Sequence, residues 1–299
     1  MKIKRVIIGC CWGFCVALAF STPAFAKLNV VATLPWIGSL AHDLGGDRIN
    51  VKTLVQPNHD PHHIEAKPSM ILAARGADLL AYNGLDLEIG YLPLLIESSR
   101  NAKIKPGQQG NLDCSQFIRV IEKRDNADRS MGDVHPLGNP HYHLSSQSVL
   151  LAAGGLAQSL AAADPGQAAF YKANLATFET KLKEKQKQWI AMPLKGKKFL
   201  AYHKFFEYLA LEAGFQIICY IEEKPGIPPS AGYVEKLVET LKKSKPDGII
   251  STGYNDQKVV EALARMTGVK SIVVPDDVGA ASDIKDWFSL MDVVLKSLK

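Results

Sequence analysis

The segment MGDVHPLGNPHYHL, residues 131–144, contains three of the eight histidines of this 299-residue chain. It lies between two halves that each alternate β-rich runs with amphipathic runs. Pro136, Gly138 and Pro140 disfavour a helix, so we expect a fixed loop here. Neutral imidazole is the commonest protein ligand for borderline-soft divalent metals. The segment therefore predicts a chain of two lobes with a metal site between them.

The first 26 residues, MKIKRVIIGCCWGFCVALAFSTPAFA, have the pattern of a secretory signal peptide. Three basic residues precede an apolar run, and Pro23 and small residues follow it, so we expect cleavage after Ala26. The apolar run is shorter than the roughly 20 residues that a spanning helix needs. An uncleaved anchor and lipidation at Cys10 stay open as alternatives. The leader predicts a periplasmic protein.

The net charge, the length and the cysteines of the chain limit its possible partners and fold. Cleavage after Ala26 removes three of the charges behind the formal net charge of +5, and the nearly neutral remainder does not predict a nucleic-acid partner. Residues 27–299 are enough for two lobes, each with its own core. Cys114 and Cys219 remain, one in each half, and whether they form a disulfide is left open.

Short runs of strand type alternate with amphipathic runs in both halves, which predicts an α/β fold of two lobes, each a four-stranded parallel sheet flanked by helices. In the first half the expected strands are 28–34, 49–55, 77–82 and 116–121, and the expected helices are 36–44, 68–75 and 87–99. In the second half the expected strands are 197–202, 215–221, 248–252 and 271–275, and the expected helices are 204–212, 231–244 and 257–267.

Two helices are expected between the halves, at 145–163 and 164–191. The second would be about 40 Å long at 1.5 Å per residue. A helix of this length is either a surface helix of one lobe or a rigid strut that joins both lobes, and we favour the strut. The predicted division is therefore a signal peptide at 1–26, an amino-terminal lobe at 27–144, connecting helices at 145–193, and a carboxy-terminal lobe at 194–299.

Candidate ligands follow the ends of predicted strands. The loop QPNHDPHH, residues 56–63, leaves one strand, and His203 and Asp276 directly follow two others. Loops at the carboxyl ends of parallel strands converge, which predicts one shared site. Each residue alone has an ordinary explanation, such as a buried hydrogen-bonded histidine for His203 or a cap for Asp276. His42 and His59 are expected to be exposed and outside the site.

Over nearly all of residues 27–299 the chain resembles the solute-binding receptors of bacterial ABC transporters for zinc and manganese. The residues that carry the resemblance are Pro61-His62, Asn83-Gly84-Leu85-Asp86-Leu87-Glu88, Asn139-Pro140-His141, Tyr202-His203 and Asp276-Asp277-Val278-Gly279. The resemblance implies that the metal ligands are His62, His141, His203 and Asp276. It also implies a receptor, not an enzyme.

The chain departs from the family pattern at four positions near these motifs: Ile64, Ala66, His143 and Ser145. A shift of the ligand role to the adjacent His63 or to His143 therefore stays open. The long histidine-rich loop of many zinc receptors is absent, and His135 with His59 is interpreted as a remnant that collects metal. Glu65, Asp256 and Asp277 are candidate acceptors for the second nitrogens of the ligand histidines.

Three imidazoles and one carboxylate suit Zn²⁺, whereas manganese receptors usually contain a further carboxylate. The resemblance thus implies a monomeric receptor that captures zinc and delivers it to an ABC-type permease in the cytoplasmic membrane, with a zinc-loading chaperone as a second candidate partner. A manganese or iron receptor is the alternative within the family. A secreted zinc hydrolase is the alternative from another class, but no His-Glu-Xaa-Xaa-His helix or nucleophile elbow is present.

Overall fold

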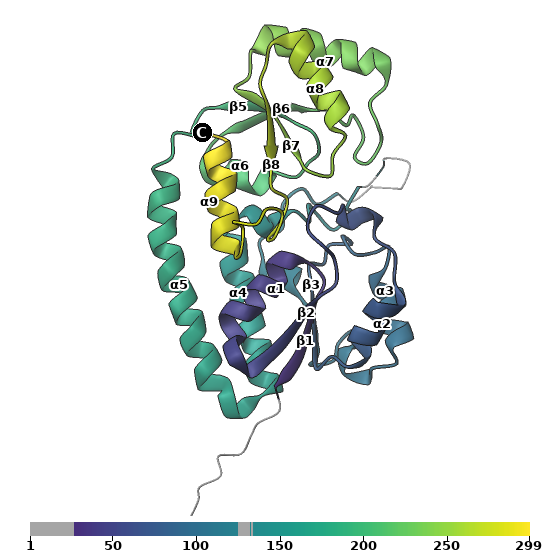
Figure 1. Ribbon diagram of the computed structural model, residues 1–299, viewed down its shortest axis with the longest axis vertical. Coiled ribbons are helices and arrows are strands. Elements are labelled where there is room, and N and C mark those ends of the chain that lie inside the picture. The colour runs from purple at the N-terminus through teal and green to yellow at the C-terminus, as the bar shows by residue number, and fades with distance from the viewer. Residues whose placement is uncertain (1–26, 125–131, 133) are drawn as a thin grey trace, which may run out of the picture.

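Two four-stranded parallel sheets form the framework of the protein in the computed structural model (Figure 1). The structure describes residues 27–124, 132 and 134–299, so the predicted signal peptide and Cys10 lie outside the described residues. The strand orders are β2-β1-β3-β4 and β6-β5-β7-β8, so both sheets have the same topology. The strands are β1 Leu28–Ala32, β2 Ile49–Thr53, β3 Leu79–Tyr82, β4 Asn111–Asp113, β5 Lys198–Ala201, β6 Gln216–Tyr220, β7 Gly248–Thr252 and β8 Ser271–Val274.

Helices flank each sheet, as the alternating pattern predicts. The first half contains α1 Pro35–Gly45, α2 Pro68–Arg75 and α3 Leu92–Ser99, and the second contains α6 Glu207–Ala213, α7 Ala231–Ser244 and α8 Gln257–Thr267. Local signals set several of these limits. The side chain of Ser230 caps α7, that of Asp256 caps α8, and Gly268, with φ +73°, ends α8 in the left-handed region. The predicted fold class is confirmed.

Three predicted elements are wrongly placed. Helix α3 begins at Leu92 instead of residue 87, because successive turns, closed by bonds such as Tyr91 N to Glu88 O, precede it. The fourth strand of the first sheet is β4, not residues 116–121, because the Asp113 carboxylate accepts from Ser115 N and turns the chain into a 3₁₀ segment, Cys114–Phe117. Helix α6 begins at Glu207 instead of residue 204, because a turn closed by Phe205 N and His203 O precedes it. These errors arise where a side-chain or turn contact interrupts an apolar pattern.

Helices α4 Ser146–Ala163 and α5 Ala168–Ile190 connect the halves. Helix α5 is about 35 Å long at 1.5 Å per residue, and Figure 1 shows it running beside the first lobe and α9 up to the loop that enters β5. It is held to α9, Trp287–Ser297, where Asp292 accepts from Lys185 Nζ at 2.5 Å and from Trp189 Nε1 at 2.8 Å. The long helix therefore has a partner from the carboxy-terminal end of the chain.

Helix α9 also fastens the second half of the chain to the first. Trp287 is fully buried, its backbone N–H donates to Ser39 Oγ of α1 at 3.1 Å, and its indole Nε1 donates to the carbonyl of His143 at 2.7 Å. The ring contacts Phe178 of α5 and Phe288. One apolar core thus extends between the sheets and supports the loop that contains His143.

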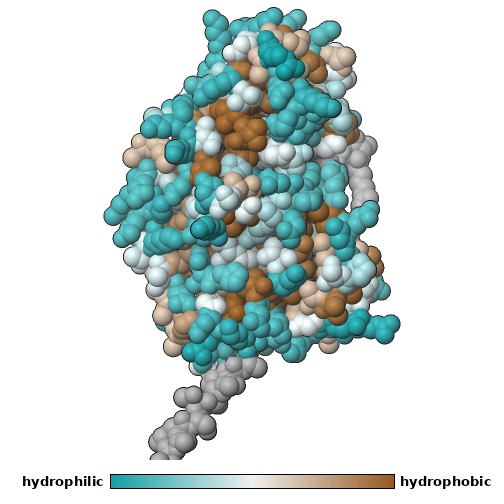
Figure 2. Space-filling model, in the orientation of Figure 1, coloured by the Kyte–Doolittle hydropathy of each residue, from teal (hydrophilic) through white to brown (hydrophobic). Residues whose placement is uncertain are grey.

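The face of the molecule seen in the orientation of Figure 1 is mostly polar. Figure 2 shows a largely hydrophilic face with a hydrophobic patch on the upper lobe. Among the described helices, none combines the length and the apolar character needed to cross a membrane. Cys114 is buried and Cys219 is partly buried, and both are free thiols.

Candidate metal-binding site

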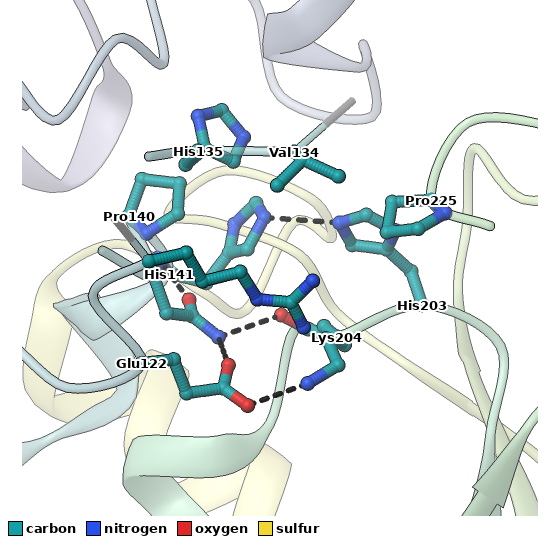
Figure 3. Close-up of a pocket in the computed structure, with 10 residues that line it drawn as sticks. Glu122, Val134, His135, Pro140, His141, His203, Lys204 and Pro225 are labelled. Carbon is teal, nitrogen blue, oxygen red and sulfur yellow. Dashed lines mark hydrogen bonds and ion pairs between the residues drawn. The ribbon is translucent and has the colours of Figure 1, made fainter. Parts of the chain in front are cut away.

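Four histidine side chains converge between the two sheets. His62 lies in the 3₁₀ segment Pro61–His63 after β2, His135 and His141 lie in the loop that precedes α4, and His203 follows β5. The Nε2 atoms of His62 and His135 are 3.1 Å apart, and those of His141 and His203 are 3.2 Å apart. Figure 3 shows the His141–His203 contact with His135 beside it.

The rings form one cluster. The ring centroid of His62 lies 5.1 Å from that of His141 and 5.4 Å from that of His203. Within the described ranges, one set of at least three potential ligands has all its ligand atoms within 4.8 Å of one another, and it consists of His62, His135 and His141. Two of the four residues expected from the resemblance, His62 and His141, belong to this set with His135, and His203 lies beside it, with its Nε2 3.2 Å from that of His141. Asp276 is not in that set.

Hydrogen bonds orient three of the rings. Nδ1 of His62 lies 2.6 Å from Asp60 Oδ1, and Nδ1 of His203 lies 2.7 Å from Glu222 Oε2. Nδ1 of His135 lies 3.1 Å from the carbonyl oxygen of Leu85. Carboxylate and carbonyl oxygens only accept, so each Nδ1 carries the proton and each Nε2 presents a bare lone pair to the cluster. This is the arrangement that ligand histidines adopt around a metal ion.

Burial keeps His135 and His141 neutral. Burial, with the neighbouring histidines, holds the pKa of His141 well below its usual value of 6.5, and the same causes lower the pKa of His135 to about 3. Burial raises the pKa of Asp60, but the hydrogen bonds and charge of His62 outweigh it and hold that pKa below the usual range. Neutral imidazoles beside an ionised carboxylate are the protonation states that bind a divalent cation.

The acceptors differ from the sequence-based candidates. Asp60 and Glu222 take the role, whereas Asp256 caps α8 and Asp277 accepts from Val278 N. Two signals could have identified them. Asp60 stands two residues before His62, and Glu222 stands just beyond the end of β6, which pairs with the strand that precedes His203.

Asp276 makes a different set of contacts. Its Oδ2 accepts from the backbone N–H of Asn58 at 2.9 Å, and its backbone carbonyl accepts from His143 Nε2 at 2.9 Å. Its Oδ1 is buried with no hydrogen-bond partner among the described residues. Burial raises the pKa of this carboxyl group above its usual value. Asp276 lines a small pocket with His59 and Tyr254, which meets the histidine cluster at His141.

The two histidines adjacent to expected ligands have other surroundings. The side chain of His63 is 64% exposed. His143 is buried, its ring stacks on Trp36 at 6.4 Å between centroids, and its Nε2 donates to Asp276. Burial lowers the pKa of His143 to about 4, although the bond to the Asp276 carbonyl acts to raise it. His143 thus serves as a contact between the halves.

The buried state of His143 predicts a pH dependence of stability. Because its folded pKa lies below the unfolded value near 6.5, the unfolded chain binds a proton that the folded chain does not. The stabilisation is complete above pH 6.5 and is lost as the pH falls towards 4. We expect the free energy of unfolding of the protein to exceed that of its His143→Gln variant at pH 7, and we expect this difference to fall by on the order of 2 kcal/mol between pH 7 and pH 5.

Urea unfolding of both metal-free proteins at each pH measures this difference. His42→Gln is the matched control, because His42 is exposed on α1 and its substitution should give the same difference at both pH values. A pH-independent difference for His143→Gln would show that this residue titrates normally in the folded protein.

Comparison with known proteins places the chain in a family. Residues 30–299 match the family model described as zinc-uptake complex component A, periplasmic. The chain belongs to this family. Membership confirms the resemblance seen in the sequence motifs. The zinc-uptake family consists of transport receptors, so the expectation of a non-enzymatic protein is confirmed at the level of the family.

Individual relatives differ in the metal for which they are named. The chain is 26% identical to the zinc-binding lipoprotein AdcA of Streptococcus pneumoniae over all of its own length and 60% of the relative's, so it spans about three fifths of that protein. It is also 26% identical to the manganese ABC transporter substrate-binding lipoprotein PsaA of Streptococcus anginosus, over 81% of this chain and 78% of the relative. A crystal structure of ZnuA matches with a TM-score of 0.76 and 27% identity, over 91% of this chain and 98% of that one.

Proposed function

We propose that this chain is a receptor that captures Zn²⁺ outside the cytoplasmic membrane and delivers it to the permease of an ABC transporter. The observation that carries the proposal is the convergence of the imidazole rings of His62, His141 and His203. They are the histidines that the family motifs single out, and they come from loops that follow both sheets. A closed set of nitrogen ligands suits capture of an ion without chemistry.

Donor chemistry supports zinc over manganese. Relatives named for zinc and for manganese are equally similar to this chain, so identity does not discriminate between the two metals. Imidazole nitrogen binds zinc more tightly than manganese, which prefers oxygen ligands. The neutral state of the buried histidines favours binding further, because no proton has to leave them first.

An ion held this way would tie the lobes together. His62 leaves the first sheet and His203 follows the first strand of the second, so zinc between them adds an interaction across the interface. Release to a docked permease would require the two lobes to move apart slightly, and the long α5 would limit that motion. We further propose that residues 1–26 are a cleavable signal peptide that directs the chain to the periplasm. The alternative is a lipoprotein signal, with Cys10 as the lipidated residue.

Zinc titration of the metal-free protein, followed by calorimetry with a competing chelator, tests the proposal. We expect one tight zinc ion per chain and manganese binding weaker by several orders of magnitude. Glu222→Gln should weaken zinc binding by about 10–100-fold, because the His203 ring loses the anion that orients its Nδ1–H.

Glu223→Gln is the matched control, because Glu223 is the exposed neighbour of Glu222 and should leave the affinity unchanged. Binding of manganese as tight as that of zinc would contradict the zinc assignment. Equal affinities in the Glu222→Gln and Glu223→Gln variants would contradict the location of the site at His203.

A further inference from the structure

The fourth position of the proposed site has two candidates within the described part of the chain, His135 and Asp276. The family resemblance points to Asp276, which follows β8. The side-chain contacts point to His135, whose Nε2 lies 3.1 Å from that of His62 and within 4.8 Å of the ligand atom of His141. The choice matters because one candidate supplies nitrogen and the other supplies oxygen.

Two of the nitrogen separations match those of a tetrahedral zinc site. Zinc–nitrogen bonds of about 2.0–2.1 Å place neighbouring ligand atoms about 3.3 Å apart in a tetrahedron. The separations in the cluster are 3.1 Å for His62 and His135 and 3.2 Å for His141 and His203. Because Nδ1 carries the proton on both His62 and His135, their Nε2 lone pairs face each other, and a cation placed between them would accept both. The four imidazoles thus form two close pairs, and His62, His135 and His141 have all their ligand atoms within 4.8 Å of one another.

The position of His135 depends on a strained turn. Leu85 and Asp86 both have positive φ, +55° and +61°, which non-glycine residues adopt only at a cost. This turn presents the carbonyl of Leu85 to Nδ1 of His135 at 3.1 Å. The carboxylate of Glu88 stabilises the same turn, because it accepts from the backbone N–H groups of Asn83 at 2.7 Å and Gly84 at 3.0 Å. The motif Asn83-Gly84-Leu85 therefore orients the His135 ring.

One carboxylate oxygen of Asp276 is engaged elsewhere, the other, Oδ1, has no hydrogen-bond partner among the described residues, and charge balance does not require Asp276 at the ion. Its Oδ2 and its backbone carbonyl accept from Asn58 and His143, which holds β8 against the loop of the first half. The two positive charges of a bound zinc ion are already offset by Asp60 and Glu222, which accept from the rings of His62 and His203. A third carboxylate would make the site anionic.

We propose that His135 is the fourth metal ligand, and that the resulting set of four imidazoles, His62, His135, His141 and His203, determines selectivity for zinc against manganese. The proposal rests on the proposed function and specifies its ligand chemistry. Without a carboxylate in contact with the ion, the site lacks the hard oxygen donor that manganese prefers. In this site Asp276 holds the lobes together and does not bind the metal.

Zinc and manganese affinities of the purified metal-free protein and its variants test this ligand set. We expect His135→Ala to weaken zinc binding by about 10–100-fold, while Asp276→Asn, which keeps an acceptor for Asn58 N, changes it less than about threefold. His135→Asp should raise the affinity for manganese relative to zinc at least about tenfold. His42→Ala is the control, because it removes an exposed histidine of α1 and should have no effect.

Cobalt(II) provides a readout that is independent of affinity. Bound Co²⁺ should show the intense visible bands of a tetrahedral site, and His135→Ala should shift them whereas Asp276→Asn should not. Equal losses of zinc affinity in Asp276→Asn and His135→Ala, or a loss in Asp276→Asn alone, would overturn the four-imidazole site. Failure of the unsubstituted protein to bind zinc would overturn the proposed function, which distinguishes the two failures.

Discussion

Alanine at His203 is expected to weaken zinc binding by at least about 100-fold, more than 2.7 kcal/mol in binding free energy. Removing the hydrogen-bond partner of a ligand histidine typically weakens metal binding by up to about 100-fold, so removing the imidazole ring itself should weaken it more. His203 also has a double role in the cluster: its Nε2 meets that of His141 at 3.2 Å, and its Nδ1 binds Glu222. Competition with a chelator of known affinity measures the loss.

The control for this variant is His42→Ala, which removes an exposed imidazole from α1 and should bind zinc like the unsubstituted protein. Thermal unfolding of the metal-free proteins separates a binding defect from a folding defect. If His203→Ala kept the full zinc affinity with an intact fold, the proposed inter-lobe site would have to be abandoned in favour of a site within the loops of the first half.

Alanine at Trp287 is expected to lower the free energy of unfolding by about 3–5 kcal/mol, the range for truncating a buried aromatic side chain. The indole is fully buried, and its ring lies 5.8 Å from Trp189 and 6.2 Å from Phe178, both on α5. The variant also leaves the carbonyl of His143 without its indole donor. Urea denaturation of the metal-free protein gives the free energy difference.

Two further variants make this test specific. Trp287→Phe keeps most of the apolar surface and loses the bond to His143, so it should cost about 1–3 kcal/mol. Ile190→Ala truncates a side chain of α5 that is 82% exposed and should change stability by less than about 0.5 kcal/mol. A loss of no more than 1 kcal/mol in Trp287→Ala would show that α9 does not fasten the two halves of the chain.

Prediction of the fold from the sequence succeeded where the signals are local. Helices α7 and α8 have the predicted limits, because a capping side chain begins each and the chain adopts the left-handed conformation at its end. The strand expected at 116–121 failed because an apolar run forms a strand only where a neighbouring strand is available to pair with it. At β4 the Asp113 cap ends that pairing early.

The candidate site shows the same division. The sequence alone indicated the family, the alternation that builds two parallel sheets, and the loops that contain His62, His141 and His203, because motifs and periodicity are properties of neighbouring residues. It did not indicate that His135 meets His62 across 73 positions, or that the carboxylate of Asp276 bonds to Asn58 across 218. Such contacts depend on how the two lobes pack against each other and on which polar groups that packing buries, and only the tertiary structure decides this.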